Sequence, residues 1–225
     1  MSVTVRDVAK KANVSVGTVS RYLNGYKLRE PNRIRIEEAI KELGFRENFI
    51  AKGLKNNRSM TIGVVLASLT DLFATSVITA AERVLAQDNY SIVVCDFESS
   101  QEKLEQKLSF LKSRSVDGLI LFPGSCTVSD ELREYLTDNI PVVIVNDDMP
   151  EFDTDKVTVD NVNASFRAVE YLIHNNHRDI AIINGDQGTY TGRERYKGYI
   201  EALRTYDIPL RDEYVTCGHF SNRGG

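Results

Sequence analysis

The stretch V-R-D-V-A-K-K-A-N-V-S-V-G-T-V-S-R-Y-L-N, residues 5–24, predicts two short helices joined by a tight turn. Thr4 is a good N-cap for the first helix, whose apolar residues recur at helical spacing. Asn13 suits the left-handed conformation that a tight turn requires. Ser15 caps the second helix, which ends at Asn24 before a glycine. The neighbouring sequence should supply the element that packs against this helical pair.

A third helix is predicted from about Pro31, a favourable first-turn residue, to Leu43. The expected core of the three helices is Val8, Ala9, Val14, Val19 and Leu23. Two helices joined by a tight turn and braced by a third describe a helix-turn-helix. The pattern alone leaves open a solvated three-helix bundle whose charges are incidental.

The outward face of the second predicted helix carries Val16, Gly17, Ser20 and Arg21. In a DNA major groove a long arginine can bond guanine, and a valine can contact the methyl group of thymine. Four flanking cations suit phosphate contacts, namely Lys10, Lys11, Arg33 and Arg35. This face is therefore a candidate for reading base edges.

The charge of the chain is divided unevenly. The whole chain has 28 Lys+Arg against 32 Asp+Glu, a net charge of −4. Residues 1–60 hold 13 basic and six acidic residues, a net charge of +7, which leaves −11 for residues 61–225. Such an asymmetry points to a nucleic-acid-binding segment joined to a body of a different kind.

The frame D-V-A…A-x-V-S…T-V-S-R-x-L-N within residues 5–24, continued by A-I-K-E-L-G-F at 39–45, resembles the opening of the lactose-repressor/galactose-repressor (LacI/GalR) family of bacterial transcriptional regulators. The resemblance continues through almost all of the remaining chain. It implies a helix-turn-helix DNA-binding domain over 1–46, a hinge helix or linker over 47–60, and an effector-binding α/β domain over 61–225. The second subdomain of that α/β domain would begin near 157.

In that family a hinge segment folds into a helix on operator DNA. By resemblance Leu54 would wedge into the minor groove, with Ala51 and Lys55 beside it, and an apolar wedge of this kind kinks the duplex. The alternative is a plain flexible tether. Two residues depart from the family pattern, since Glu47 replaces a usual proline and Arg29 a usual capping serine. The full set expected at DNA is Thr4, Val5, Ser15, Val16, Gly17, Thr18, Ser20, Arg21, Asn24, Arg29, Asn48, Ala51, Leu54 and Lys55.

From Thr61 onward, short β-branched runs alternate with helical stretches. Predicted strands are 62–67, 91–97, 118–122, 142–146, 157–160 and 180–184, and predicted helices are 75–88, 101–114, 129–138, 163–175 and 193–206. This alternation favours an α/β fold with a parallel sheet, which binds ligands at the carboxyl ends of its strands. The stretches I-G-V-V (62–65), V-D-G-L-I-L (116–121) and R-E-R-Y-K-G-Y (193–199) resemble the periplasmic-binding-protein-like core of the same family, itself similar to periplasmic sugar-binding proteins.

The loops after the predicted strands are rich in Asp, Asn, Ser, Thr and Arg, which suits a polyhydroxylated ligand. By resemblance Phe73 would line the effector pocket and Arg195 would bond the ligand as a bidentate donor, with Asp160, Thr189 and Thr191 close by. Other interpretations stay open: Arg195 as a salt-bridged helix residue, Phe73 as a core residue, and Asp160 as a cap.

Enzyme signatures are absent from the sequence. Neither G-x-G-x-x-G after the first strand nor G-x-x-x-x-G-K-[ST] nor G-x-S-x-G occurs. Cys95, Cys126 and Cys217 include no C-x-x-C pair, and the three histidines are scattered. No catalytic residue, cofactor or metal is expected. Because no apolar run approaches the ~20 residues of a membrane span, a cytoplasmic protein is expected.

The expected function is that of a sequence-specific DNA-binding repressor of carbohydrate-related genes, controlled by a sugar or sugar derivative. If the chain is complete, two-fold pairing of heads on a palindromic operator implies a homodimer. The alternatives are a sugar-binding protein with a vestigial head, or a truncated and inactive regulator. The 225 residues fall short of the family's usual length by about a third, so the chain is expected to be C-terminally truncated or part of a longer one, with an incomplete second subdomain and exposed apolar faces.

Overall fold

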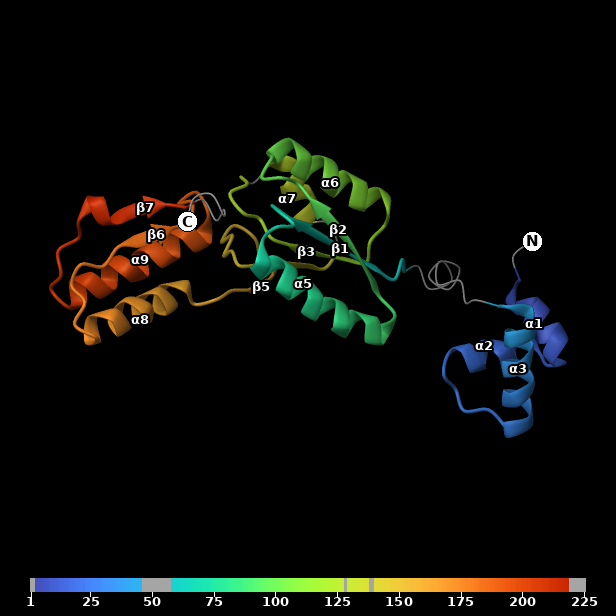
Figure 1. The fold of residues 1–225 in the computed structure, drawn as a ribbon. Coiled ribbons are helices and arrows are strands. Elements are labelled where there is room, and N and C mark those ends of the chain that lie inside the picture. The colour runs from blue at the N-terminus through green and yellow to red at the C-terminus, as the bar shows by residue number, and fades with distance from the viewer. Residues whose placement is uncertain (1–2, 46–57, 128, 138–139, 219–225) are drawn as a thin grey trace. The chain divides into compact units, whose positions relative to one another are not determined.

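The computed structural model describes residues 3–45, 58–127, 129–137 and 140–218. The chain divides into two compact units, Met1–Asn56 and Asn57–Gly225, which we call the head and the body. Figure 1 shows helices alone in the described part of the head, and helices with parallel strands in the body. Each unit is described by itself.

The described head consists of α1 (Val5–Ala12), α2 (Val16–Leu23) and α3 (Glu30–Leu43). The predicted caps are confirmed. Thr4 and Asp7 form a reciprocal capping box, in which the Thr4 amide donates to Asp7 Oδ2 at 2.9 Å. Asn13 is left-handed with φ 51°, and Ser15 Oγ accepts from the Thr18 amide at 3.1 Å. Local hydrogen bonds therefore set where α1 ends and α2 begins.

A single apolar cluster holds the head together. Val8, Ala9 and Val19 are buried as predicted, whereas Val14 and Leu23 lie partly buried at its edge. The third helix completes the cluster with Ile36 and Ala39. Arg29 precedes α3 without a side-chain cap, and the helix begins at Glu30, one residue before Pro31.

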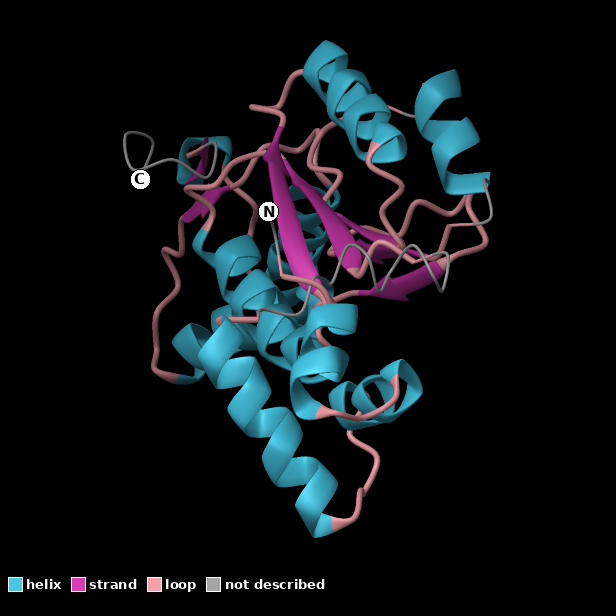
Figure 2. Cartoon of the chain, turned by 90° about the vertical axis from the view of Figure 1, so that its right-hand side faces the viewer, coloured by secondary structure: helices cyan, strands magenta, loops and turns pink. Residues whose placement is uncertain are grey.

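The first sheet of the body is five-stranded, parallel and ordered β2-β1-β3-β4-β5. Its strands are β1 (Thr61–Leu66), β2 (Ser91–Asp96), β3 (Gly118–Leu121), β4 (Val142–Val145) and β5 (Asp155–Val157). Helix α5 (Leu72–Leu85), followed by the 3-10 turn η1 (Ala86–Asp88), covers one face, while α6 (Gln101–Ser113) and α7 (Asp130–Thr137) cover the other (Figure 2). The α/β fold with a parallel sheet is confirmed.

Alternation along β1 sends side chains to both faces of that sheet. Val64 and Leu66 pack in the cluster that includes Ala74 of α5. Val65 packs instead in the cluster of Leu104 and Leu108 from α6. Because side chains of a strand point alternately to its two faces, a continuous apolar strand is what a sheet covered on both sides requires.

The rest of the body contains α8 (Asn161–His174), β6 (Ile182–Asn184), α9 (Tyr190–Thr205), η2 (Asp212–Tyr214) and β7 (Val215–Cys217). Strands β6 and β7 pair in parallel as a separate two-stranded sheet. Helices α8 and α9 lie side by side (Figure 1). They approach closely at Gly198, where a Cβ atom would stand 2.1 Å from the carbonyl oxygen of Val162.

Three predicted helix starts were wrong, each by two or three residues. Helices expected at 75, 163 and 193 begin at Leu72, Asn161 and Tyr190. The reason is capping, because Asp71, Asp160 and Thr189 accept hydrogen bonds from amides of the first turn. The predicted strand 157–160 was misplaced for the same reason, since Asp160 already caps α8, and β7 was not predicted.

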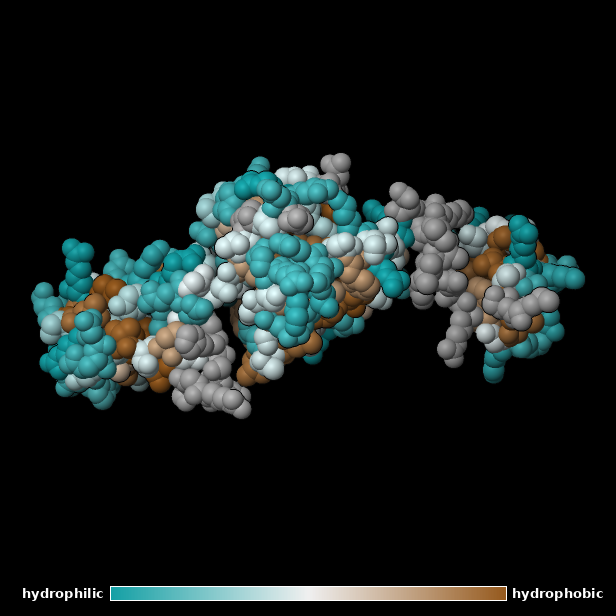
Figure 3. All heavy atoms as spheres, turned by 90° about the horizontal axis from the view of Figure 1, so that it is seen from above, coloured by the Kyte–Doolittle hydropathy of each residue, from teal (hydrophilic) through white to brown (hydrophobic). Residues whose placement is uncertain are grey.

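Large apolar side chains also reach the surface of the body, and Figure 3 shows such hydrophobic patches beside hydrophilic ones. Leu72 and Tyr171 are the most exposed of them, at 81% and 69%. Within the described ranges, no helix is both long enough and apolar enough to cross a membrane.

The capping box makes the stability of the head depend on pH. Hydrogen bonds from Thr4 lower the pKa of the Asp7 carboxyl below its ordinary value of 3.8. Its contribution to stability is therefore present above pH 3.8 and is lost as the pH falls through the lowered pKa. Replacing Asp7 by asparagine should reduce the loss of stability at acid pH. Amide exchange of α1, measured between neutral and acid pH, follows this loss. Equal acid sensitivity in both proteins would contradict the role given to the carboxylate.

Candidate functional site

The exposed side of α2 carries the residues predicted to read bases. Val16 is 47% exposed, and Gly17 and Arg21 are also exposed, while Ser20 is partly buried. The opposite side of the helix anchors it, because Val19 is fully buried in the head cluster. A rigidly held short helix thus presents an apolar and a cationic side chain to solvent.

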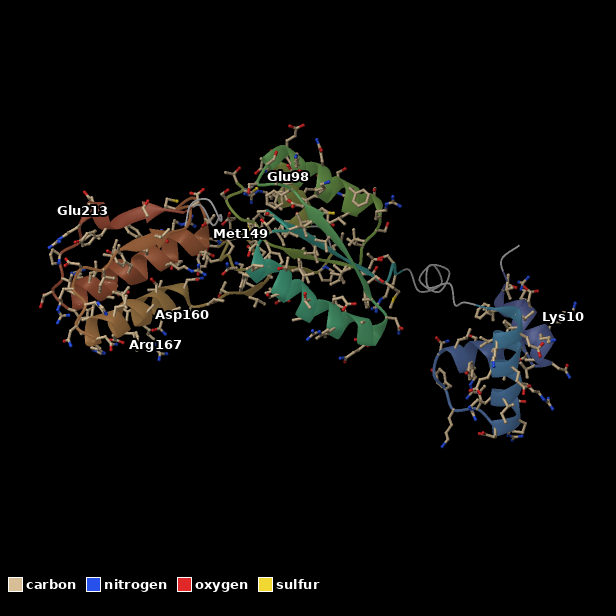
Figure 4. The ribbon with its side chains drawn as sticks, in the orientation of Figure 1. Lys10, Glu98, Met149, Asp160, Arg167 and Glu213 are labelled. Atoms are coloured by element: carbon tan, nitrogen blue, oxygen red, sulfur yellow. The ribbon has the colours of Figure 1, made fainter. Side chains whose placement is uncertain are left out.

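The four flanking cations differ in their partners. Lys11 pairs with Glu42 at 2.5 Å, and Arg33 bridges Glu30 and Glu37 at 2.6 and 2.7 Å. Exposed Lys10, labelled on α1 in Figure 4, has no ion pair within the described residues, and the same holds for Arg35. Of the four, Lys11 and Arg33 are thus paired with carboxylates, whereas Lys10 and Arg35 are unpaired among the described residues.

Most of the other described residues predicted at DNA have structural roles in the head. The Thr4 hydroxyl donates to Asp7 at 2.7 Å, and the Ser15 and Thr18 hydroxyls bond each other at 2.8 Å. Asn24 Nδ2 donates to the Ser20 carbonyl at 2.9 Å. Val5 packs at the edge of the head cluster, and Arg29 is exposed. The predicted hinge residues Asn48, Ala51, Leu54 and Lys55 lie outside the described residues.

The body holds the last two residues of the predicted hinge or linker, Ser59 and Met60. Asp117 Oδ1 accepts from the Ser59 amide at 2.7 Å and from its hydroxyl at 3.0 Å, and Oδ2 accepts from the Met60 amide at 3.0 Å. Met60 has a left-handed φ of 54°, which is costly for a residue with a side chain. One carboxylate therefore fixes the point where the chain enters β1.

Removing this carboxylate should loosen the entry point. In an Asp117→Ala variant the Ser59 and Met60 amides should exchange about ten-fold faster, because bonds to a charged acceptor are lost. Asp153→Ala is the matched control, since Asp153 is exposed and forms no hydrogen bond within the described ranges. Residue-resolved hydrogen exchange checks this, and unchanged exchange in Asp117→Ala would contradict the anchoring role.

A chain of polar side chains joins the end of β4 to α8 and α9. Asn146 Nδ2 donates to Thr191 Oγ1 at 2.6 Å, and Asn161 Nδ2 donates to Asn146 Oδ1 at 3.4 Å. Arg195 Nε then donates to Asn161 Oδ1 at 3.1 Å. Asn161 and Thr191 are buried, with 3% and 7% of their surface exposed. We call Asn146, Asn161, Thr191 and Arg195 the polar network.

The polar network brings together two of the five residues predicted at the effector, Thr191 and Arg195. Arg195 is held by an amide rather than by a carboxylate, and its terminal nitrogens have no hydrogen bond within the described residues. The other two members, Asn146 and Asn161, were missed as individual site residues. Their positions in the sequence could have indicated them, because Asn146 directly follows β4 and Asn161 directly follows Asp160.

The remaining three predicted residues lie outside the polar network. Asp160 is exposed and caps α8 by accepting from the Asn163 amide at 3.0 Å, so the interpretation as a cap is confirmed (Figure 4). Thr189 caps α9, accepting from the Gly192 amide at 3.1 Å. Phe73 lies in the first turn of α5 and is 39% exposed, so the interpretation as a core residue was wrong.

An acidic loop follows β4 next to the polar network. Asp147 Oδ1 accepts from the Met149 amide at 3.0 Å, and Figure 4 labels Met149 on this loop. Burial raises the pKa of the Asp147 carboxyl, the Met149 bond opposes this, and the charge of Asp148 raises it further. Burial, with the nearby acids Glu194, Asp148 and Asp147, also raises the pKa of Tyr190. Carboxylates and a phenol in this setting suit a ligand rich in hydroxyl groups.

No group of histidine, cysteine or acidic side chains within the described ranges could hold a metal ion. The polar atoms of the body that gather beyond the strand ends are amides, hydroxyls, carboxylates and a guanidinium. Such a set can recognise a ligand by hydrogen bonds.

Two family descriptions match the chain. Residues 4–48 match bacterial regulatory proteins of the lacI family, and residues 59–224 match periplasmic binding proteins and the sugar binding domain of the LacI family. Together they cover the head and the body.

Individual relatives agree with these descriptions. Catabolite control protein A of Priestia megaterium is 31% identical over 227 residues, which cover 100% of this chain and 68% of that protein. The HTH-type transcriptional repressor PurR of Actinobacillus pleuropneumoniae is 28% identical over 223 residues, covering 99% and 66%. The chain thus spans about two thirds of the length of the curated relatives that it matches.

Solved structures show the same likeness. The lac repressor dimer bound to operator and the anti-inducer ONPF superposes with a TM-score of 0.80 at 25% identity, covering 100% of this chain and 68% of that one. The complex of the transcriptional regulator CelR with cellobiose has a TM-score of 0.63 at 28% identity, covering 99% and 67%. The chain belongs to the LacI family of bacterial regulatory proteins.

Proposed function

We propose that this chain is a sequence-specific DNA-binding repressor that works in the cytoplasm as a homodimer on a palindromic operator. The observation that carries the proposal is α2, a capped helix that is anchored by buried Val19 and presents Val16, Gly17 and Arg21 to solvent. A helix presented in this way can enter the major groove. The net charge of +7 over residues 1–60 favours approach to phosphates.

The same features favour a working head over a vestigial one. Both predicted N-caps are made, the turn at Asn13 is left-handed, and the apolar cluster is closed by α3. Relatives named as repressors support this assignment.

The proposed effector is a sugar or sugar derivative bound beside the polar network. Support comes from the amides, hydroxyls and guanidinium gathered around Asn146 and Asn161, and from the cellobiose complex of a related regulator. Its control of DNA affinity would follow from unequal binding to two conformations of the body. Carbohydrate-related genes are the expected targets. No catalytic activity is proposed.

The experiment that tests the proposal is selection from a duplex library whose central stretch is fully randomised, so that symmetric and asymmetric sequences compete. The full chain is mixed with the library, and the bound duplexes are recovered and sequenced. We expect one two-fold symmetric sequence to be enriched. Recovery of DNA without any enriched sequence would overturn the proposal, even if binding itself is tight.

Arg195 should be needed for effector binding. A panel of common mono- and disaccharides is tested for stabilisation of the body against thermal unfolding. Replacing Arg195 by alanine should lower the affinity for the stabilising saccharide about ten-fold, because a hydrogen bond from a charged donor is lost. Arg167→Ala, an exposed arginine of α8, is the matched control and should respond as wild type (Figure 4). An undiminished response in Arg195→Ala would remove Arg195 from the site.

A further inference from the structure

The chain turns back on itself directly after α2. The Gly25 amide donates to the Tyr22 carbonyl at 3.0 Å, and the Tyr26 amide donates to the Arg21 carbonyl at 3.0 Å. Gly25 has the left-handed φ of 76° that such a helix end requires. This pair of bonds is a Schellman motif, which places the second residue after the cap against the last turn of its helix. Tyr26 is thereby brought back beside Arg21.

The side chains of the two residues also meet. Arg21 Cζ lies 5.6 Å from the centre of the Tyr26 ring, within the range of a cation–π contact. Tyr26 is 61% exposed and takes no part in the apolar cluster of the head. Arg21 has no ion pair within the described residues. The ring therefore adds little to the packing of the head, and its observed partner is the guanidinium.

We propose that Tyr26 is a positioning residue for DNA reading, which holds the Arg21 guanidinium ready for a base edge. The proposal rests on the proposed function of α2. A free arginine must give up many rotamers to place its planar fork on guanine. A ring held in place by the helix end removes part of that loss before DNA binds, so discrimination improves without a new contact to DNA.

The test uses the full chain and the library selection described above. Wild type, Arg21→Ala, Tyr26→Ala, Tyr26→Phe and the double variant Arg21→Ala/Tyr26→Ala are compared on the selected duplex and on duplexes with one base pair changed at a time. Tyr26→Ala should lose about two- to five-fold in discrimination at the base pair read by Arg21, which is the worth of an exposed cation–π contact. Tyr26→Phe keeps the ring and should behave as wild type. In the Arg21→Ala background, Tyr26→Ala should change nothing further.

Other results overturn the proposal. An even loss of affinity for all duplexes in Tyr26→Ala would make Tyr26 an ordinary DNA contact. A loss in Tyr26→Phe would assign the effect to the hydroxyl. If wild type enriches a sequence and these variants fail the pattern, the positioning role alone is wrong. If wild type enriches no sequence, the proposed function itself is wrong.

Discussion

Replacing Arg21 by alanine should abolish preference at one base pair in each half-site of the operator. Arg21 is exposed on α2 and has a guanidinium that can bond guanine through two parallel hydrogen bonds. Loss of such a pair removes about 1–3 kcal/mol of discrimination, or about 5- to 150-fold in relative affinity. Titrations of the selected duplex and of its single-base variants measure this directly.

Lys10→Ala is the matched comparison for Arg21→Ala. Lys10 is an exposed cation of α1 without an ion pair among the described residues, so it suits a phosphate. Its loss should weaken binding to all duplexes alike. It should also reduce the magnitude of the slope of log affinity against log salt concentration by about one. If Arg21→Ala also weakens binding to every duplex evenly, α2 is not the recognition helix.

Replacing Gly198 by alanine should destabilise the packing of α8 against α9. The added Cβ would stand 2.1 Å from the Val162 carbonyl oxygen and 2.9 Å from Ser165 Cβ. These atoms belong to α8, so the helices must separate. Overpacking of this kind costs about 1–3 kcal/mol or more. Because α8 and α9 carry Asn161 and Arg195, effector binding should weaken with it.

Gly17→Ala provides the control for this substitution. Gly17 is also a helical glycine, but a Cβ there would meet only Ser15 Oγ at 3.7 Å. Alanine is favoured over glycine in an open helical position by about 1 kcal/mol, so α2 should be slightly stabilised. Amide exchange in α2 measures the effect of Gly17→Ala, and amide exchange in α8 and α9 measures the effect of Gly198→Ala. Unchanged protection of α8 and α9 in Gly198→Ala would contradict the close approach described.

Much of the head could be predicted from its sequence because its boundaries are local. Thr4 and Ser15 accept hydrogen bonds from amides three residues later, Asn13 adopts the left-handed conformation of the turn, and the structure has each of them in the predicted role. The pairing of Arg21 with Tyr26 escaped prediction, although it is also local. It depends on the geometry of the helix end, which the residue types alone do not reveal.

The site in the body was harder to predict because its contacts join distant residues. Asn146 and Thr191 are 45 residues apart, and Asn161 and Arg195 are 34 apart. The alternation of strands and helices predicted which loops lie at the strand ends, but not which side chains meet there. Asp160 and Thr189 were chosen as ligand residues, and the structure shows both as helix caps. Their roles toward an effector stay predictions.

The proposed repressor must distinguish one DNA sequence from all others. The most direct measurement is the ratio of two dissociation constants at one physiological salt concentration, for the selected palindrome and for a scrambled duplex of the same composition. A sequence-specific repressor should bind the palindrome at least about 10³-fold more tightly than the scrambled duplex. Equal affinity for the two duplexes would contradict the proposed function.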